Sequence, residues 1–173
     1  MVKLSIFLQL NCCKLRQFKE MSSFIGEFDC KLDAKGRLMV PSGLRKQLDP
    51  AANESFVLNR GFEQCLVLYP KNDWDRISAE VNQLNQYVKK NRDFIRYFYR
   101  GATEMSLDGT GRLLLPKRLQ QYAGIDKEVV LFAYSDRIEV WDKDKYEGLL
   151  TDEPEDFANL AEEVMGDKSK EGE

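Results

Sequence analysis

Residues 32–44 read Leu-Asp-Ala-Lys-Gly-Arg-Leu-Met-Val-Pro-Ser-Gly-Leu, and residues 107–119 read Leu-Asp-Gly-Thr-Gly-Arg-Leu-Leu-Leu-Pro-Lys-Arg-Leu. Shifted by 75 positions, the two stretches share Leu, Asp, Gly, Arg, Leu, Pro and Leu in register. Such a duplication predicts a pseudo-symmetric molecule made of two equivalent halves. In each half an arginine, Arg37 or Arg112, directly follows a turn glycine. These two side chains are therefore the first candidates for a functional site.

Each copy has the hydrophobic pattern of short strands around a tight turn. Apolar and polar residues alternate at positions 28–32, which is typical of a half-buried strand. Asp33 can accept hydrogen bonds from backbone NH groups that follow it, and Gly36 can adopt the positive φ that the turn requires. An extended chain resumes at residues 37–40. The proline that follows is suited to opening a short helix because its fixed φ and missing NH are harmless there.

Two further strands and a helix complete each copy. The unit is therefore β-β-α-β-β-α, used twice, and the fold class is α+β. In the first copy the closing strands are expected at residues 55–59 and 65–69, followed by a helix that carries Trp74. In the second copy strands are expected at residues 103–107, 113–115, 128–134 and 137–141, with Gly124 ending the short helix and Tyr146 on the last one.

The predicted domains are residues 24–74 and 102–150, joined by a helical connector at 75–101 and followed by an acidic tail at 151–173. In the connector, one stripe of apolar residues includes Ile77 and Val88 and a second includes Phe94. These stripes fit either an amphipathic helix packed on the core or a face for a neighbouring subunit or DNA. The first 20 residues match nothing in the repeat, and we expect them to be a dispensable extension rather than a signal peptide.

The charge of the chain is unevenly distributed. The formal net charge of the 173 residues is −3, but the tail from residue 151 onward contains 9 acidic residues against 2 lysines, a balance of −7. The first 150 residues carry 24 basic and 20 acidic residues, a balance of +4. A mildly basic body can present a positive surface to a polyanion, because the local patch decides such binding.

Catalysis has little support in this sequence. There is no histidine, which removes the commonest general base and the commonest metal ligand. The glycines at 36 and 111 lack the spacing of phosphate-binding loops, and the four cysteines lack the spacing of a metal site. Asp33 and Asp108 could be imagined as an acid–base pair, but each stands where a turn cap is wanted. We therefore expect no enzyme, metal, cofactor or small-molecule substrate.

The arginines at the two turns have two possible roles. A guanidinium can clamp a phosphate or read guanine in the major groove, and a β-ribbon of two strands fits that groove. Lys35 adds a second charge in the first copy, whereas Thr110 stands at that position in the second. Alternatively, Arg37 and Arg112 pair with the aspartates of their own turns and stabilise them.

The duplicated Leu-Asp-x-x-Gly-Arg-Leu-x-x-Pro unit resembles the AbrB-like swapped-hairpin domain of bacterial transition-state regulators. The whole layout is similar to the MraZ family, which is associated with a division and cell-wall gene cluster. Four further stretches carry this resemblance: Phe24-Ile-Gly-Glu-Phe, Gly61-Phe-Glu-Gln-Cys-Leu-Val-Leu-Tyr-Pro, Phe94-Ile-Arg-Tyr-Phe-Tyr-Arg-Gly-Ala and Asp136-Arg-Ile-Glu-Val-Trp. The resemblance runs from residue 24 to about residue 150.

The resemblance implies an intramolecular pseudo-dimer barrel of two AbrB-like halves that assembles into a homo-oligomeric ring. It further implies a transcriptional regulator that binds direct repeats of double-stranded DNA upstream of its own operon. In this sequence the DNA-binding positions would be Arg37, Lys35 and Arg112. The structural turn positions would be Asp33, Gly36, Asp108 and Gly111.

We therefore expect a cytoplasmic, nucleoid-associated regulator with no membrane contact. Two alternatives stay open: an AbrB-like interaction or assembly module without specific DNA binding, and a hydrolase that uses Asp33 and Asp108. The operator sequence, the number of subunits and the choice between repression and activation do not follow from the sequence.

Overall fold

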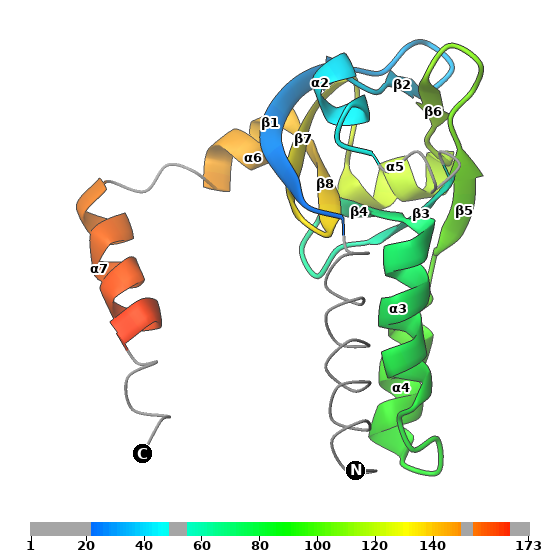
Figure 1. Ribbon diagram of the computed structural model, residues 1–173, viewed down its shortest axis with the longest axis vertical. Helices are drawn as coiled ribbons and strands as arrows, with labels where there is room; N and C mark the ends of the chain where they lie inside the picture. Colours follow the sequence, from blue (N-terminus) through cyan, green and yellow to red (C-terminus); the bar gives the residue numbers. More distant parts are fainter. Residues whose placement is uncertain (1–21, 49–54, 150–153, 167–173) are drawn as a thin grey trace, which may run out of the picture.

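Each copy of the duplicated unit folds into the same series of elements. The computed structural model describes residues 22–48, 55–149 and 154–166. The first copy comprises β1 (Phe24–Lys31), β2 (Arg37–Met39), α2 (Ser42–Arg45), β3 (Ser55–Arg60), β4 (Leu66–Pro70) and α3 (Lys71–Asn82). The second comprises β5 (Thr103–Ser106), β6 (Arg112–Leu114), α5 (Lys117–Ala123), β7 (Glu128–Ser135), β8 (Arg137–Asp142) and α6 (Lys143–Leu149). The predicted α+β class and the repeated β-β-α-β-β-α order are confirmed (Figure 1).

The strands pair across the two copies. One sheet has the order β1-β7-β8-β4-β3-β5, and a second sheet consists of β2 and β6. β1, β3 and β4 of the first copy are equivalent to β5, β7 and β8 of the second. If each strand is replaced by its equivalent, the same order is obtained from the opposite end of the sheet, so the sheet is pseudo-symmetric. Every strand pair between neighbours is antiparallel. The fold is thus an intramolecular pseudo-dimer, and the exchange of strands fits a swapped hairpin, although the sheet is open.

The two-stranded sheet, here called the ribbon, is made of one strand from each copy and not of two consecutive strands joined by a turn. In the first copy, the chain directly after β1 meets β2 at an isolated bridge between Leu32 and Leu38, and within the described residues the two strands form no ladder with each other. The ribbon forms instead between β2 of the first copy and β6 of the second, with Leu38 opposite Leu113 at its centre. It therefore joins the two halves, and the two turns enter it from opposite ends.

The main core lies between this ribbon and the six-stranded sheet. Leu38 and Leu113 point inward and are almost fully buried, as are Leu44 of α2 and Leu119 of α5. These leucines occupy equivalent positions of the two copies and belong to one apolar cluster with residues of β3, β4, β7 and β8. Burial of one shared cluster by both copies explains why the two halves form a single unit.

A second, aromatic cluster covers the other face of the sheet. Trp74 of α3 and Tyr146 of α6, the two aromatic positions that follow the closing strands, are both buried there. The Trp74 ring stacks on Phe98, with ring centroids 5.1 Å apart. The Tyr146 hydroxyl donates to Oε2 of Glu27 at 2.7 Å.

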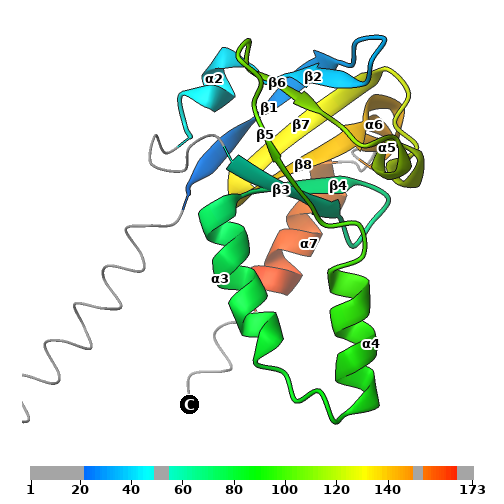
Figure 2. The ribbon, with the colours of Figure 1, turned by 90° about the vertical axis from the view of Figure 1, so that its right-hand side faces the viewer.

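The connector contains two helices rather than one continuous helix. After α3, the chain turns and continues as α4 (Lys89–Phe98), and both helices extend away from the sheet on the same side (Figures 1 and 2). The NH of Tyr87 donates to the Asn85 side chain at 2.9 Å, an Asx turn that competes with helical hydrogen bonding. Val88 and Phe94 from the two predicted apolar stripes are exposed, so this part of the connector does not pack on the core.

The acidic tail contains a further helix, α7 (Pro154–Gly166), whose apolar side chains Phe157, Leu160 and Val164 are exposed. The extension at residues 1–20 and the tail beyond residue 166 lie outside the described residues. Among the helices that the structure describes, none is long and apolar enough to cross a membrane.

Candidate nucleic-acid interface

The first turn is organised by the carboxylate of Asp33. Its Oδ1 accepts hydrogen bonds from the backbone NH of Lys35 at 2.9 Å and of Arg37 at 3.0 Å. The backbone oxygen of Asp33 accepts from the NH of Gly36 at 2.9 Å. Gly36 adopts a φ of 77°, a conformation that costs other residues energy. One carboxylate thus fixes the path of the chain from the end of β1 into β2.

The same carboxylate holds the arginine side chain. Nε and Nη2 of Arg37 both lie 2.6 Å from Oδ2 of Asp33. The hydrogen bonds from Arg37, first of all from its backbone NH, lower the pKa of Asp33 below its ordinary value. The guanidinium therefore has a fixed orientation, while 29% of the Arg37 side chain stays exposed. The pairing of arginine with aspartate, one of the two roles considered above, exists in the free protein.

The second turn repeats this geometry with one added contact. Asp108 Oδ1 accepts from the NH of Thr110 at 2.9 Å and of Arg112 at 3.0 Å, and Arg112 Nε donates to Oδ2 at 2.9 Å. Gly111 has a φ of 79°. The hydroxyl of Thr110 also donates to Oδ1 at 2.7 Å. This hydroxyl, followed by the bonds from Arg112, holds the pKa of Asp108 well below its usual range.

The outward face of the ribbon carries both arginines and two apolar side chains. Side chains alternate along a strand, so Arg37 and Met39 point away from the core when Leu38 points into it. In the register of the ribbon, Arg37 lies opposite Leu114, and Met39 lies opposite Arg112. Met39 and Leu114 are 50% and 59% exposed. This face, here called the ribbon face, has a guanidinium at each end and apolar side chains next to them.

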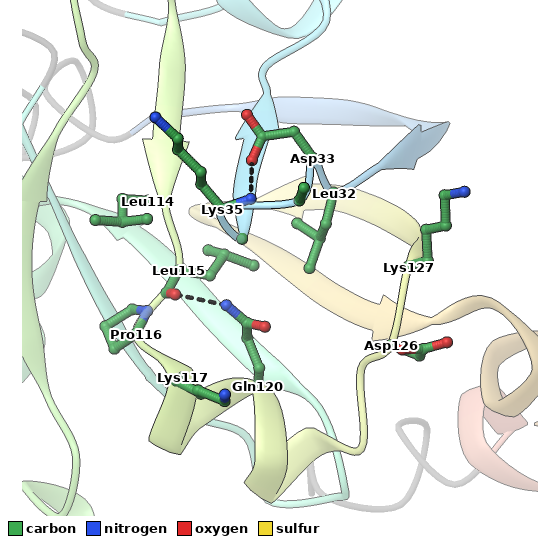
Figure 3. A pocket seen from close by; sticks show the side chains of 12 residues that line it. Leu32, Asp33, Lys35, Leu114, Leu115, Pro116, Lys117, Gln120, Asp126 and Lys127 are labelled. Carbon is green, nitrogen blue, oxygen red and sulfur yellow. Dashed lines mark hydrogen bonds between the residues drawn. The ribbon is translucent and has the colours of Figure 1, made fainter.

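A cleft of about 850 Å³ opens beside the first turn. It lies between residues 32–36 and the segment that runs from the end of β6 through α5 to the loop before β7 (Figure 3). Lys35, Lys117 and Lys127 line it from three different segments. Lys117 and Lys127 were not singled out from the sequence, because no local pattern shows that they approach a turn more than 80 residues earlier in the chain.

Each turn glycine is covered by a side chain from the other copy. A Cβ atom on Gly36 would lie 2.5 Å from Nε2 of Gln120, which belongs to α5. A Cβ atom on Gly111 would lie 2.1 Å from Nη1 of Arg45, which belongs to α2. Figure 2 shows the same relation, with α5 beside the turn before β2 and α2 beside the turn before β6. Positions 45 and 120 differ by the repeat offset of 75, the one signal in the sequence that could have pointed to Arg45.

The described cysteines and acidic side chains give no sign of a reactive thiol or a metal site. Burial raises the pKa of the Cys30 thiol to about 11 and that of Cys65 to about 12. Within residues 22–48, 55–149 and 154–166, no group of three or more His, Cys, Asp or Glu side chains could hold a metal ion.

Comparison with known proteins agrees with the duplication. A family model described as "MraZ protein, putative antitoxin-like" matches this chain twice, at residues 23–97 and 98–168. The chain is 51% identical over 153 residues to a protein of Christiangramia forsetii named Transcriptional regulator MraZ, covering 88% of this chain and 99% of that protein. Proteins of the same name from Flavobacterium psychrophilum and Cytophaga hutchinsonii are 50% and 38% identical, over 84% and 87% of this chain and 94% and 100% of theirs. Two repeats that each match the model, and relatives aligned over almost their full length, show that this chain belongs to the MraZ family.

Proposed function

We propose that this protein is a sequence-specific DNA-binding transcriptional regulator without catalytic activity, and that the ribbon face contacts DNA. The observation that carries the proposal is the pair of arginines on that face, each held by the aspartate of its own turn. The names of its relatives, transcriptional regulators all, support the same function. In this proposal the DNA-binding residues are Arg37, Lys35 and Arg112.

The contact with Asp33 prepares Arg37 for binding. It engages Nε and Nη2 of the guanidinium, and the N–H groups of Nη1 take no part in it. A guanidinium held in one plane loses less conformational entropy when it forms hydrogen bonds with a phosphate or with O6 and N7 of guanine. The aspartate thus has a positioning role, and the earlier alternatives of ion pairing and DNA binding are compatible.

The dimensions and chemistry of the ribbon face suit the major groove. That groove admits a two-stranded β-ribbon, and apolar side chains such as Met39 and Leu114 can contact the methyl group of thymine. The lysines of the cleft beside the first turn would face phosphates on the flank of the groove. Phosphate contacts of this kind set the position of the protein, whereas contacts to the base edges give specificity.

We further propose that several copies form a ring and bind evenly spaced direct repeats upstream of the division and cell-wall gene cluster that contains this gene. One ribbon with few cations binds weakly, but successive subunits on one DNA molecule raise the effective concentration for each next contact. The exposed apolar residues between α3 and α4 and on α4, namely Leu84, Tyr87, Val88, Phe94 and Tyr97, are available for contacts between subunits. A cytoplasmic, nucleoid-associated location follows from this role.

Fluorescence anisotropy with labelled DNA from upstream of the gene tests the proposal. Wild-type protein should bind this DNA more tightly than a scrambled sequence, and binding should weaken steeply as salt rises, because phosphate contacts release counterions. No preference for the upstream DNA by folded, oligomeric protein would reject specific DNA binding.

A second candidate function is an interaction or assembly module. It is favoured by the exposed side chains of Tyr87, Phe94 and Tyr97 between and along the connector helices, which are 97%, 42% and 54% accessible. A stoichiometric protein partner that co-purifies with a protein lacking DNA affinity would support this alternative.

A further inference from the structure

Each turn glycine is covered by a side chain of the other copy, and this side chain differs between the two turns. In the first turn, Gln120 covers Gly36 and donates from Nε2 to the backbone oxygen of Leu115 at 2.6 Å. In the second turn, the equivalent position of the other copy is Arg45, and its guanidinium lies over Gly111. A neutral amide at one turn is thus matched by a cation at the other.

This difference offsets a second difference between the copies. The first turn contains Lys35, whereas the second contains Thr110 at the equivalent position. Counting only residues of its own copy, the second turn has one cation fewer. Because the copies exchange strands, Arg45 of the first copy supplies a positive charge to the turn that lacks the lysine. At these two pairs of equivalent positions, 35 with 110 and 120 with 45, each end of the ribbon then has one cationic side chain in addition to its turn arginine.

We infer that Arg45 is a DNA-binding residue that contacts a phosphate next to the second turn, where it takes the part of the missing lysine. The inference rests on the proposed function, because it assumes that the ribbon face meets DNA. Its ligand is the sugar–phosphate backbone and not a base edge, so Arg45 is expected to contribute affinity without sequence preference.

The surroundings of Arg45 fit this role. The residue is exposed, and it forms no ion pair with any acidic side chain in the part of the chain that the structure describes. Arg37 and Arg112, by contrast, are each paired with an aspartate. Gly111 provides the space, since any side chain there would displace the guanidinium. An unpaired guanidinium beside the turn that holds Arg112 raises the local positive potential, which favours an anion at that end of the ribbon.

The test compares Arg45→Gln, which recreates the side chain of the first turn, with Lys46→Gln, which removes the adjacent exposed charge. Anisotropy is measured at several salt concentrations with both upstream and scrambled DNA. We expect Arg45→Gln to weaken binding to both DNAs by about tenfold, the scale of one charge-assisted hydrogen bond. The slope of log K against log salt should become shallower by about 1 for each bound chain. Lys46→Gln should change both quantities less.

A compensating variant tests the proposed replacement directly. Adding Thr110→Lys to Arg45→Gln should restore most of the affinity and the salt slope, because it returns a cation to the second turn from within its own copy. Arg45→Lys should also keep most of the slope, which separates the charge of Arg45 from its packing. A thermal melt of each variant checks that the fold is intact.

The outcomes separate this inference from the function on which it rests. If Arg45→Gln binds like wild type while Arg112→Ala loses affinity, the ribbon face binds DNA and the role of Arg45 is wrong. If the loss with Arg45→Gln is confined to upstream DNA, Arg45 does not act on the phosphate backbone. If the wild-type protein itself has no affinity for DNA, the proposed function fails and takes this inference with it.

Discussion

The two turns have the same backbone conformation and each contains an aspartate–arginine pair, but the side chains around them differ. Asp33 and Asp108 form equivalent hydrogen bonds to the NH groups that follow, and the two glycines have φ values of 77° and 79°. The first turn adds Lys35 and is covered by Gln120. The second adds Thr110 and is covered by Arg45. A turn in this fold is therefore completed by both copies, and the residues of one copy alone do not describe it.

The largest expected effect concerns the equivalence of the two copies in the core, which is tested by Leu38→Ala and Leu113→Ala. These leucines face each other at the centre of the ribbon and are 1% and 0% exposed. Truncation of a fully buried leucine costs about 2–5 kcal/mol of unfolding free energy. We expect similar losses for both variants in urea unfolding, and a small effect for the exposed Met39→Ala. A large loss in only one leucine variant would break the pseudo-symmetry of the core.

The next test is Arg37→Ala against Arg112→Ala in the anisotropy assay. Loss of a bidentate contact to a base costs about 1–3 kcal/mol, so Arg37→Ala should weaken binding by about 5- to 150-fold. Arg112→Ala should weaken it detectably. Arg96→Ala, which removes an exposed arginine of α4, serves as the matched control. Wild-type affinity in both turn variants would refute the assignment of the ribbon face.

Exchanging the residues that differ between the turns should have a smaller effect. Lys35→Thr gives the first turn the residue of the second and removes one cation beside the cleft. We expect the salt slope to become shallower by about 1, with little change in the preference for upstream over scrambled DNA. Thr110→Lys alone should steepen the slope. A changed sequence preference in either variant would mean that this position reads bases.

The smallest expected effect concerns the titration of the two turn aspartates. The hydroxyl of Thr110 is the largest cause that lowers the pKa of Asp108, and the first turn has no such donor. Carboxyl-carbon NMR should therefore show Asp108 titrating below Asp33. Thr110→Val should raise the pKa of Asp108 and leave Asp33 unchanged.

The same shifts give the sign of a pH dependence. Because both folded-state pKa values lie below that of an unfolded aspartate, about 3.9, each ionised carboxylate stabilises the fold fully above that value. The contribution is lost as pH falls through the folded-state pKa. Thr110→Val, which raises the folded-state pKa of Asp108, should therefore remove part of this stabilisation at neutral pH, and the difference from wild type should vanish as pH falls through the folded-state pKa.

Local features of the fold could be predicted from the sequence. The alternation at residues 28–32, the Asp–Gly turns and the helices after Pro41 and Pro116 depend on near neighbours in the chain, and all of them are present. The break between α3 and α4 also has a local cause, the Asx turn at Asn85. The helical spacing of apolar residues on both sides of Asn85 nevertheless favoured a helical connector without a break.

The exchange of strands could not be derived from the pattern. A strand that alternates apolar and polar residues has the same pattern whichever strand it pairs with, so only the family resemblance suggested pairing across the copies. Arg45, Lys117 and Lys127 could not be predicted either, because they lie beside turns of the other copy only once the strands have been exchanged. The site residues Arg37, Lys35 and Arg112 stay a prediction that the binding experiments above address.

The pairing of β1 with β7 sets a condition on how the chain acquires its fold during synthesis. Phe24 lies opposite Ser135, so the first strand finds its neighbour only after more than 100 further residues have been made. Closing so long a loop is slow relative to local contacts. At a synthesis rate of about 5–20 residues per second, β1 lacks its only neighbour in the six-stranded sheet for about 5–20 seconds. We therefore expect the nascent first copy to depend on chaperones until the second copy leaves the ribosome.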